Sequence, residues 1–100
     1  MAENKNCCNN HTVRSEETNS ALISRLNRIE GQVRGIRGMV ENDVYCDDIL
    51  TQISAVRSAL DSAARILLES HIRTCVAPRL AENDPDILPE FIKTVSRLTK

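Results

Sequence analysis

The sequence has 100 residues, which is enough for one small domain. Thirteen lysines and arginines nearly balance fourteen aspartates and glutamates, and the formal net charge of −1 excludes a bulk polycation of the histone type. No stretch reaches the roughly 20 apolar residues of a membrane-spanning helix, and the polar start lacks the apolar core of a signal peptide. We therefore expect a cytoplasmic protein without a membrane segment, whose four cysteines are reduced thiols available for metal or redox chemistry.

The first nineteen residues are polar, and we predict a disordered tail over 1–19 followed by a single domain over 20–100. The tail contains Cys7, Cys8 and His11. Adjacent cysteines are poorly disposed to chelate one ion, and ordering a tail costs conformational entropy. We interpret these residues as part of a solvated tail, and a role in metal capture stays open.

Two long helices follow from apolar residues that recur in steps of four and three. The first seam, within residues 21–41, contains Leu22, Leu26, Ile29, Val33, Ile36 and Val40. The second, within residues 47–76, contains Ile49, Ile53, Val56, Leu60, Ala63 and Leu67. We expect Asn19 or Ser20 to cap the first helix and Pro78 to end the second.

A short third helix is predicted after the turn A-E-N-D-P, with Asp84 as its N-cap and Pro85 at its first position. Pro89 fits such a start poorly, which shifts the expected start to Asp86 or later. The apolar stripe of this helix contains Leu88, Phe91, Val95 and Leu98. The fold class is all-α, and one hairpin with a short third helix cannot bury both seams. Two hairpins from two chains would do so as a four-helix bundle.

One set of reactive side chains points to a metal site. His71 and Cys75 are four residues apart, a spacing that places both on one helix face. Cys46 precedes His71 by 25 residues, roughly 37 Å along a straight helix. An antiparallel partner would bring Cys46 of one chain to His71 and Cys75 of the other, with two equal sites per dimer. The alternative is structural: two small buried cysteines and a core histidine.

Two thiolates and one imidazole form a soft set of three ligands. Trigonal coordination of this kind suits Cu(I), whereas structural zinc prefers four ligands. Zinc with a bound water stays an alternative. The sequence shows neither a carboxylate arrangement for metal-assisted hydrolysis nor a nucleophile with its base, so we expect no enzymatic activity.

Three segments carry a resemblance to a known family. They read R-L-N-R-I-E-G-Q-V-R-G-I at 25–36, Y-C-D-D-I-L-T-Q-I-S-A-V-R-S-A-L at 45–60 and H-I-R-T-C at 71–75. Over residues 20–100 the chain resembles the copper-sensing operon repressor group of the CsoR/RcnR family of bacterial transcriptional repressors. The resemblance implies antiparallel dimers of helical hairpins, paired into a disc-shaped homotetramer. It also implies one Cu(I) per protomer at an intersubunit site made by Cys46, His71 and Cys75.

The same resemblance implies two hydrogen-bond partners for the ligating histidine, a tyrosine and a glutamate. Tyr45 matches the tyrosine directly. Glu90 matches the glutamate only if the preceding turn aligns without a shift, because a slip of one residue would place Phe91 there. A metal-bound imidazole commonly donates its other N–H to such a partner. The alternatives are a packing tyrosine and a surface glutamate.

Operator DNA is the partner that the resemblance implies. Four arginines of the first helix, opposed by Glu30 alone between residues 25 and 37, give a local charge of +3; they are Arg25, Arg28, Arg34 and Arg37. Arg57 or Arg65 of the second helix would extend this surface, and four copies in a tetramer would multiply it. Without the resemblance, a solvated helix flank would be the preferred interpretation.

The resemblance implies a repressor that binds its operator without copper and releases it on Cu(I) binding, with a copper chaperone as a candidate partner. Two alternatives stay open. One is a sensor of reactive sulfur in which Cys46 and Cys75 of different chains become linked, although such chemistry has no need of His71. The other is a copper-buffering helical oligomer without a role at DNA.

Overall fold

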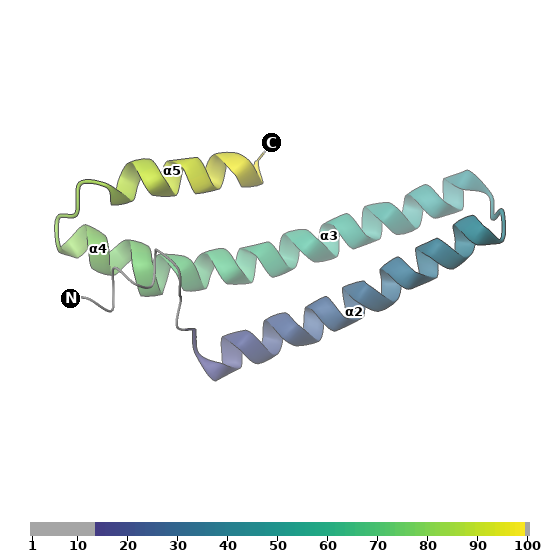
Figure 1. Cartoon of the computed structure of the whole chain (residues 1–100), viewed down its shortest axis with the longest axis horizontal. Helices are drawn as coiled ribbons and strands as arrows, with labels where there is room; N and C mark the ends of the chain where they lie inside the picture. Colours follow the sequence, from purple (N-terminus) through teal and green to yellow (C-terminus); the bar gives the residue numbers. More distant parts are fainter. Residues whose placement is uncertain (1–13, 100) are drawn as a thin grey trace. The chain divides into compact units, whose positions relative to one another are not determined.

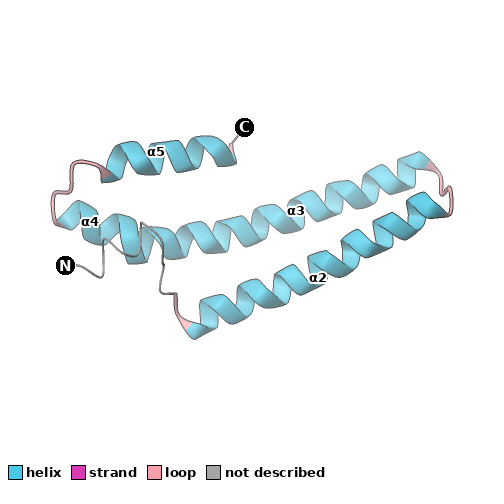
Figure 2. Ribbon diagram, viewed as in Figure 1, coloured by secondary structure: helices cyan, strands magenta, loops and turns pink. Residues whose placement is uncertain are grey.

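The computed structural model describes residues 14–99, in which the backbone is helical or in turns and forms no strand (Figure 2). The helices, labelled as in Figure 1, are α2 (Glu16–Glu41), α3 (Cys46–His71), the π-helix η1 (Ile72–Val76), α4 (Ala77–Ala81) and α5 (Ile87–Leu98). The predicted all-α fold is confirmed. No helix in the described part of the chain is long and apolar enough to cross a membrane. Cys7, Cys8 and His11 lie outside the described residues.

Helix α2 begins earlier than the sequence pattern predicts. Its N-cap is Ser15, whose hydroxyl oxygen accepts a hydrogen bond from the backbone N–H of Thr18 at 3.1 Å. Glu16 and Glu17 occupy the first turn, where negative charge interacts favourably with the helix dipole. The predicted cap at Asn19 or Ser20 is therefore wrong, and residues 16–19 form the first turn of α2. A polar stretch becomes helical here because its residues satisfy the free N–H groups of a helix start.

A Schellman motif ends α2 and begins the turn toward α3. The N–H of Asp43 donates to the carbonyl of Val40 at 3.2 Å, and the N–H of Val44 donates to that of Met39 at 3.0 Å. Asp43 has a φ of 55°, a left-handed conformation that aspartate tolerates better than most residues. These hydrogen bonds satisfy carbonyls at the helix end and reverse the chain within four residues.

The described residues form two compact units, Ser15–Leu67 and the part of the chain from Leu68 onward. In the first unit, α2 and the larger part of α3 run side by side in opposite directions (Figure 1). Alternate members of each predicted seam face inward: Ile29, Val56 and Ala63 are buried, and Leu22, Ile36 and Ile49 are half-buried. The other members are exposed, namely Leu26, Val33, Val40, Ile53, Leu60 and Leu67.

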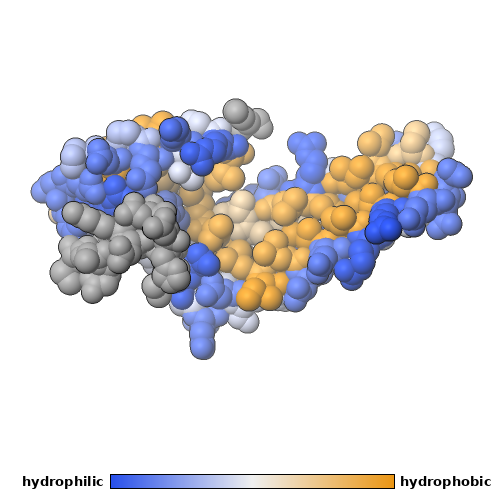
Figure 3. Space-filling model, viewed as in Figure 1, coloured by the Kyte–Doolittle hydropathy of each residue, from blue (hydrophilic) through white to orange (hydrophobic). Residues whose placement is uncertain are grey.

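The hairpin thus covers only every second position of its own seams. Apolar side chains are visible along α2 and α3 in the space-filling view (Figure 3). Val33 and Leu60, for example, stay 51% and 46% exposed. Leaving this much apolar surface in water is unfavourable, at roughly 25 cal/mol for each Å². The single chain therefore presents an apolar strip that packing within the hairpin does not bury.

The helical run of α3 continues without a break through η1 into α4. Pro78 does not end it, contrary to the prediction. The proline is the second residue of α4 and directly follows the π-helical turn. Within a helical run a proline lacks one backbone donor, and its ring crowds the carbonyl four residues back. Just before it, the N–H of Ala77 donates to the carbonyl of Ile72, five residues back. This wider π-helical turn lets the chain pass the proline and remain helical.

The second unit, from Leu68 onward, packs α4 and α5 around a small core. Ile87 and Cys75 are completely buried there, and Val76 is nearly so. A second Schellman motif ends α4, with Asn83 at a φ of 60° and the N–H of Asp84 bonded to the carbonyl of Arg79 at 3.0 Å. This motif turns the chain toward α5.

Helix α5 starts at Ile87, so the predicted start at Asp86 or later is confirmed. Pro89 falls in the first turn, where a proline is tolerated. Asp84 is not the N-cap that the sequence pattern indicates. The N–H of Asp86 donates to Asp84 Oδ1 at 3.0 Å. This hydrogen bond closes a local turn that precedes α5.

Candidate metal centre

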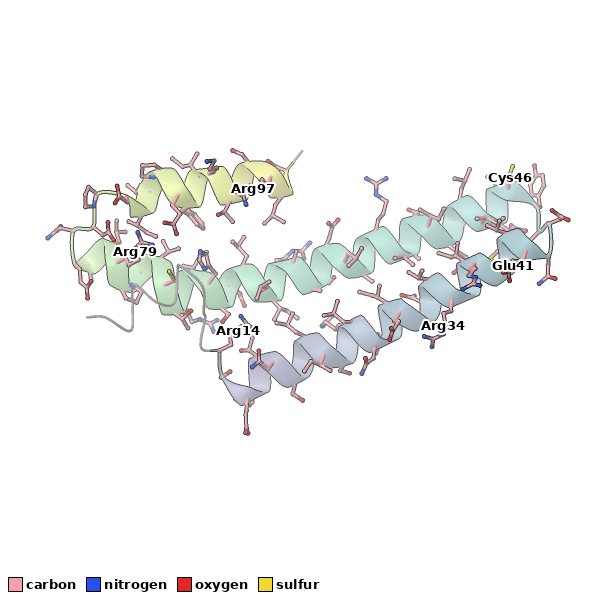
Figure 4. The ribbon with its side chains drawn as sticks, in the orientation of Figure 1. Arg14, Arg34, Glu41, Cys46, Arg79 and Arg97 are labelled. Atoms are coloured by element: carbon pink, nitrogen blue, oxygen red, sulfur yellow. The ribbon has the colours of Figure 1, made fainter. Side chains whose placement is uncertain are left out.

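Cys46 is the first residue of α3 and carries a free, exposed thiol (Figure 4). The turn between α2 and α3 holds it there. The carbonyl of Tyr45 accepts the N–H groups of Asp48 and Ile49 at 3.1 and 3.3 Å, which starts the helix directly at the cysteine. The side chain of Tyr45 is 71% exposed. This end of α3 therefore offers one accessible soft ligand with a neighbouring phenol.

His71 is the last residue of α3, and Cys75 lies four residues later within η1. The hydroxyl of Thr74 donates to the carbonyl of Ser70 at 2.8 Å across this part of the helix. π-Helical turns often occur at functional sites because they change the spacing of side chains along a helix face. His71 and Cys75, the two candidate ligands, therefore lie on one helical segment at the C-terminal end of α3.

The four cysteines were expected to be reduced, and of the two within residues 14–99 the structure differs at Cys75. Cys46 is a free thiol, whereas Cys75 is completely buried and disulfide-bonded. A disulfide sulfur is not a thiolate ligand. Cys75 can therefore bind a metal ion only after its disulfide is reduced.

Phe91 of α5 stacks on the His71 ring. The two ring centroids lie 6.5 Å apart with an interplanar angle of 27°, a stacked arrangement. The resemblance implied that Glu90 is a hydrogen-bond partner of the histidine. In the structure, Arg79 Nη1 instead donates to Oε1 and Oε2 of Glu90, at 3.2 and 3.1 Å. The position next to Glu90, which a slip of one residue would have indicated, is the one that touches His71.

Arg79 is a buried residue that sequence reasoning missed. Its Nε donates to Asp84 Oδ2 at 2.7 Å, and its Nη1 pairs with Glu90, so one guanidinium joins α4 to the start of α5. The hydrogen bond with Asp84 is the largest cause of a raised pKa for Arg79; burial acts in the opposite direction, and Glu90 adds to the rise. No periodic signal marks such a residue, because its partners lie five and eleven positions away across a turn.

Within residues 14–99 of one chain, no three histidine, cysteine, aspartate or glutamate side chains come together to hold a metal ion. Cys46 belongs to the first unit, and His71 and Cys75 belong to the second. The structure thus brings two of the three predicted ligands onto one short helical segment and keeps the third at the opposite end of α3.

The arginines expected at DNA all lie on the first unit, on α2 and α3, and all are exposed: Arg25, Arg28, Arg34, Arg37 and Arg57. Arg65 is exposed as well. Arg34 is marked on α2 in Figure 4. Arg37 forms a 3.3 Å ion pair with Glu41, and both side chains are largely in solvent. Such a pair is weak and screened by salt, so Arg37 can exchange its carboxylate for another anion.

The chain is similar in sequence to proteins of one described family. Residues 18–97 match the sequence model of the family described as "Metal-sensitive transcriptional repressor". The copper-sensing transcriptional repressor CsoR of Bacillus subtilis is 46% identical over 88 residues, covering 87% of each chain. The copper-sensing transcriptional repressor RicR of Mycobacterium tuberculosis is 51% identical over 79 residues, covering 76% of this chain and 82% of RicR.

Two solved structures share the fold. A crystal structure of the copper-sensing repressor CsoR with Cu(I) from Geobacillus thermodenitrificans superposes with a TM-score of 0.80 at 42% identity, covering 88% of this chain and 93% of that one. The nickel-responsive transcriptional regulator InrS superposes with a TM-score of 0.69 at 36% identity, covering 88% and 97%. The chain therefore belongs to the CsoR/RcnR family of metal-sensitive transcriptional repressors.

Proposed function

We propose that the protein is a cytoplasmic, Cu(I)-responsive repressor that binds operator DNA without copper and releases it when Cu(I) binds. The observation that carries this proposal is the donor set at the two ends of α3, an accessible thiol at Cys46 and a His71–Cys75 pair on the η1 segment. Two sulfurs and one imidazole nitrogen are ligands that Cu(I) prefers. The similar proteins described as copper-sensing repressors support the same metal.

The site would form between two antiparallel copies. The exposed members of both seams support a second copy as the cover of the hairpin, since an identical hairpin offers an equally apolar strip. An antiparallel arrangement sets the start of one α3 beside the end of the other. Cys46 of one chain then joins His71 and Cys75 of its partner, giving one Cu(I) per protomer. Pairing of two dimers into a homotetramer stays a prediction from the resemblance.

Each of the three ligands must meet a condition before it can bind Cu(I). Cys46 is available as it stands, Cys75 must first be reduced, and His71 must keep one ring nitrogen unprotonated toward the metal. Tyr45, directly beside Cys46, is the candidate hydrogen-bond partner for the other ring nitrogen of a ligating histidine across the dimer. The carboxylate of Glu90 is paired with Arg79 in this structure.

Release of DNA on Cu(I) binding requires that the copper site and the DNA surface affect each other's affinity. Exposed arginines of α2 and α3 would neutralise phosphates of the operator, which makes binding dependent on salt. If Cu(I) lowers the affinity for DNA by some factor, DNA lowers the affinity for Cu(I) by the same factor. A copper chaperone that delivers the ion stays a prediction.

Complementation between two defective chains tests the intersubunit site. One chain carries Cys46→Ala and the other carries His71→Ala with Cys75→Ala, and both are kept reduced. Each homodimer lacks ligands at both of its sites, whereas a mixed dimer has one site with all three ligands and one with none. We expect tight Cu(I) binding, measured against a competing chelator, to return at about one ion per mixed dimer. Mixed dimers that form without binding copper tightly would contradict the proposal.

A DNA titration separates the proposal from the two alternatives. The probe is the duplex upstream of the protein's own gene, with an unrelated duplex as control. A copper-responsive repressor binds the first duplex more tightly and releases it on addition of Cu(I). A copper buffer would bind neither duplex specifically. A sulfur sensor would release DNA after treatment with an inorganic polysulfide without copper. The polysulfide would oxidise the two thiols and leave as sulfide, and the linked Cys46–Cys75 pair would be detectable by mass spectrometry.

A further inference from the structure

The histidine of the proposed copper site has an aromatic neighbour on α5. The rings of His71 and Phe91 stack at 6.5 Å and 27°, and both side chains are half-buried within the unit that begins at Leu68. A phenyl ring can neither donate nor accept a conventional hydrogen bond. The contact of α5 with this imidazole is therefore one of ring packing, which depends on the orientation of both rings.

The backbone that carries Phe91 is fixed by the preceding residue. Both carboxylate oxygens of Glu90 accept Arg79 Nη1, and the same guanidinium binds Asp84 at 2.7 Å. The side chain of Arg79 is only 8% exposed. A guanidinium with two carboxylate partners has little freedom to move, so α4 and the first turn of α5 are joined at one point. Phe91 is the next residue after Glu90, so its backbone is held by the same ion pair.

We propose that Phe91 is a positioning residue for the His71 imidazole, and that the Arg79–Glu90 ion pair holds Phe91 in place. In this arrangement α5 responds to His71 through ring packing, not through a hydrogen bond that the imidazole donates to Glu90. A metal ion that fixes the orientation of the imidazole forces the phenyl ring either to follow or to lose the stack. The part of the inference that concerns copper rests on the proposed function, whereas the packing itself does not.

The contact can be tested on the full-length, reduced, copper-free protein by NMR of its histidine ring protons. The chain has only two histidines, so a His71→Gln variant assigns the His71 signals. Protons above the face of an aromatic ring are shielded, so Phe91→Leu should move the His71 ring protons downfield, and Phe91→Tyr should restore them. Glu90→Gln, which changes neither ring, should cause a smaller shift of the same sign. An Ile92→Ala control truncates the neighbouring, exposed residue and should cause none.

The second measurement is the ratio of operator affinities without and with Cu(I). Phe91→Leu removes the free energy of the aromatic stack from the coupling between copper and DNA. We therefore expect this variant to reduce the ratio roughly three- to tenfold. Phe91→Tyr and Ile92→Ala should match the parent in this ratio, and all three variants should bind DNA normally without copper. If Phe91→Leu leaves the ratio unchanged and only Glu90→Gln reduces it, α5 acts through the carboxylate and the proposal is wrong.

The two measurements also separate this inference from the proposed function. A parent protein that does not release DNA on addition of Cu(I) contradicts the proposed function, and the NMR measurement then decides the positioning role alone. Unchanged His71 signals in Phe91→Leu would show that the phenyl ring does not position the imidazole, whatever the response of the parent to copper.

Discussion

Replacing Arg79 by methionine should destabilise the protein by about 3 kcal/mol. Methionine keeps much of the apolar stem, so the loss is mainly that of the charged hydrogen bonds. The bond to Asp84 is short and its carboxylate is only 18% exposed, so we assign it about 2 kcal/mol. The carboxylate of Glu90 is 40% exposed, and solvent screening reduces its share to about 1 kcal/mol. Both carboxylates stay behind without their cation, which makes truncation of one partner costly.

Thermal unfolding followed by circular dichroism measures this effect. For a chain of this size each kcal/mol corresponds to roughly 4–8 °C, so the midpoint should fall by about 12–24 °C. Arg97→Met is the matched control, because Arg97 is an exposed arginine on α5 (Figure 4). We expect the control to stay within about 0.5 kcal/mol of the parent. An Arg79→Met protein as stable as the Arg97→Met control would refute the role given to this ion pair.

Four further outcomes can be checked. Ser15→Ala removes the acceptor for the Thr18 N–H and should cost about 1 kcal/mol in thermal unfolding, whereas an effect below a few tenths would place the helix start elsewhere. Leu60→Asp puts a charge on the exposed half of the seam and should yield monomers in sedimentation experiments with unchanged helix content; an intact oligomer would contradict the proposed interface. Arg34→Ala should weaken operator binding and lower its salt slope by about 1, at unchanged copper affinity; full affinity would remove Arg34 from the DNA surface. His71→Ala should keep much of the Cu(I) affinity through two thiolates but release DNA poorly, and normal release would make the histidine a ligand only.

Regular features of this protein were predictable because they repeat locally. The steps of four and three in the two seams indicate two long helices, and these helices are present as α2 and α3. The spacing of His71 and Cys75 indicates that they share one stretch of helix, and they do lie on neighbouring turns. Family membership was likewise predictable from the segments at 25–36, 45–60 and 71–75, and it is confirmed.

Helix ends were harder to predict because several residue types compete for the same role. The prediction named Asn19 or Ser20 as the cap and not Ser15. Each of these residues has a side-chain oxygen, and only the backbone geometry selects one. Pro78 was expected to end a helix because its ring removes a donor. The wider turn at Ile72–Val76 accommodates it instead, and such a turn has no periodic signal of its own.

By itself, the sequence determined the all-α class, the two seams, the donor types and the family, since each of these is written in residue identity and short-range spacing. Only the tertiary structure decided that one half of each seam faces inward and that Arg79 takes the Glu90 carboxylate. It also decided that Phe91, one residue further along, meets the His71 ring. Neighbours on a helix point about 100° apart, so a difference of one residue changes the chemistry beside the histidine from a carboxylate to a phenyl ring. Such a difference depends on how α5 packs against the residues before it, which no local pattern contains.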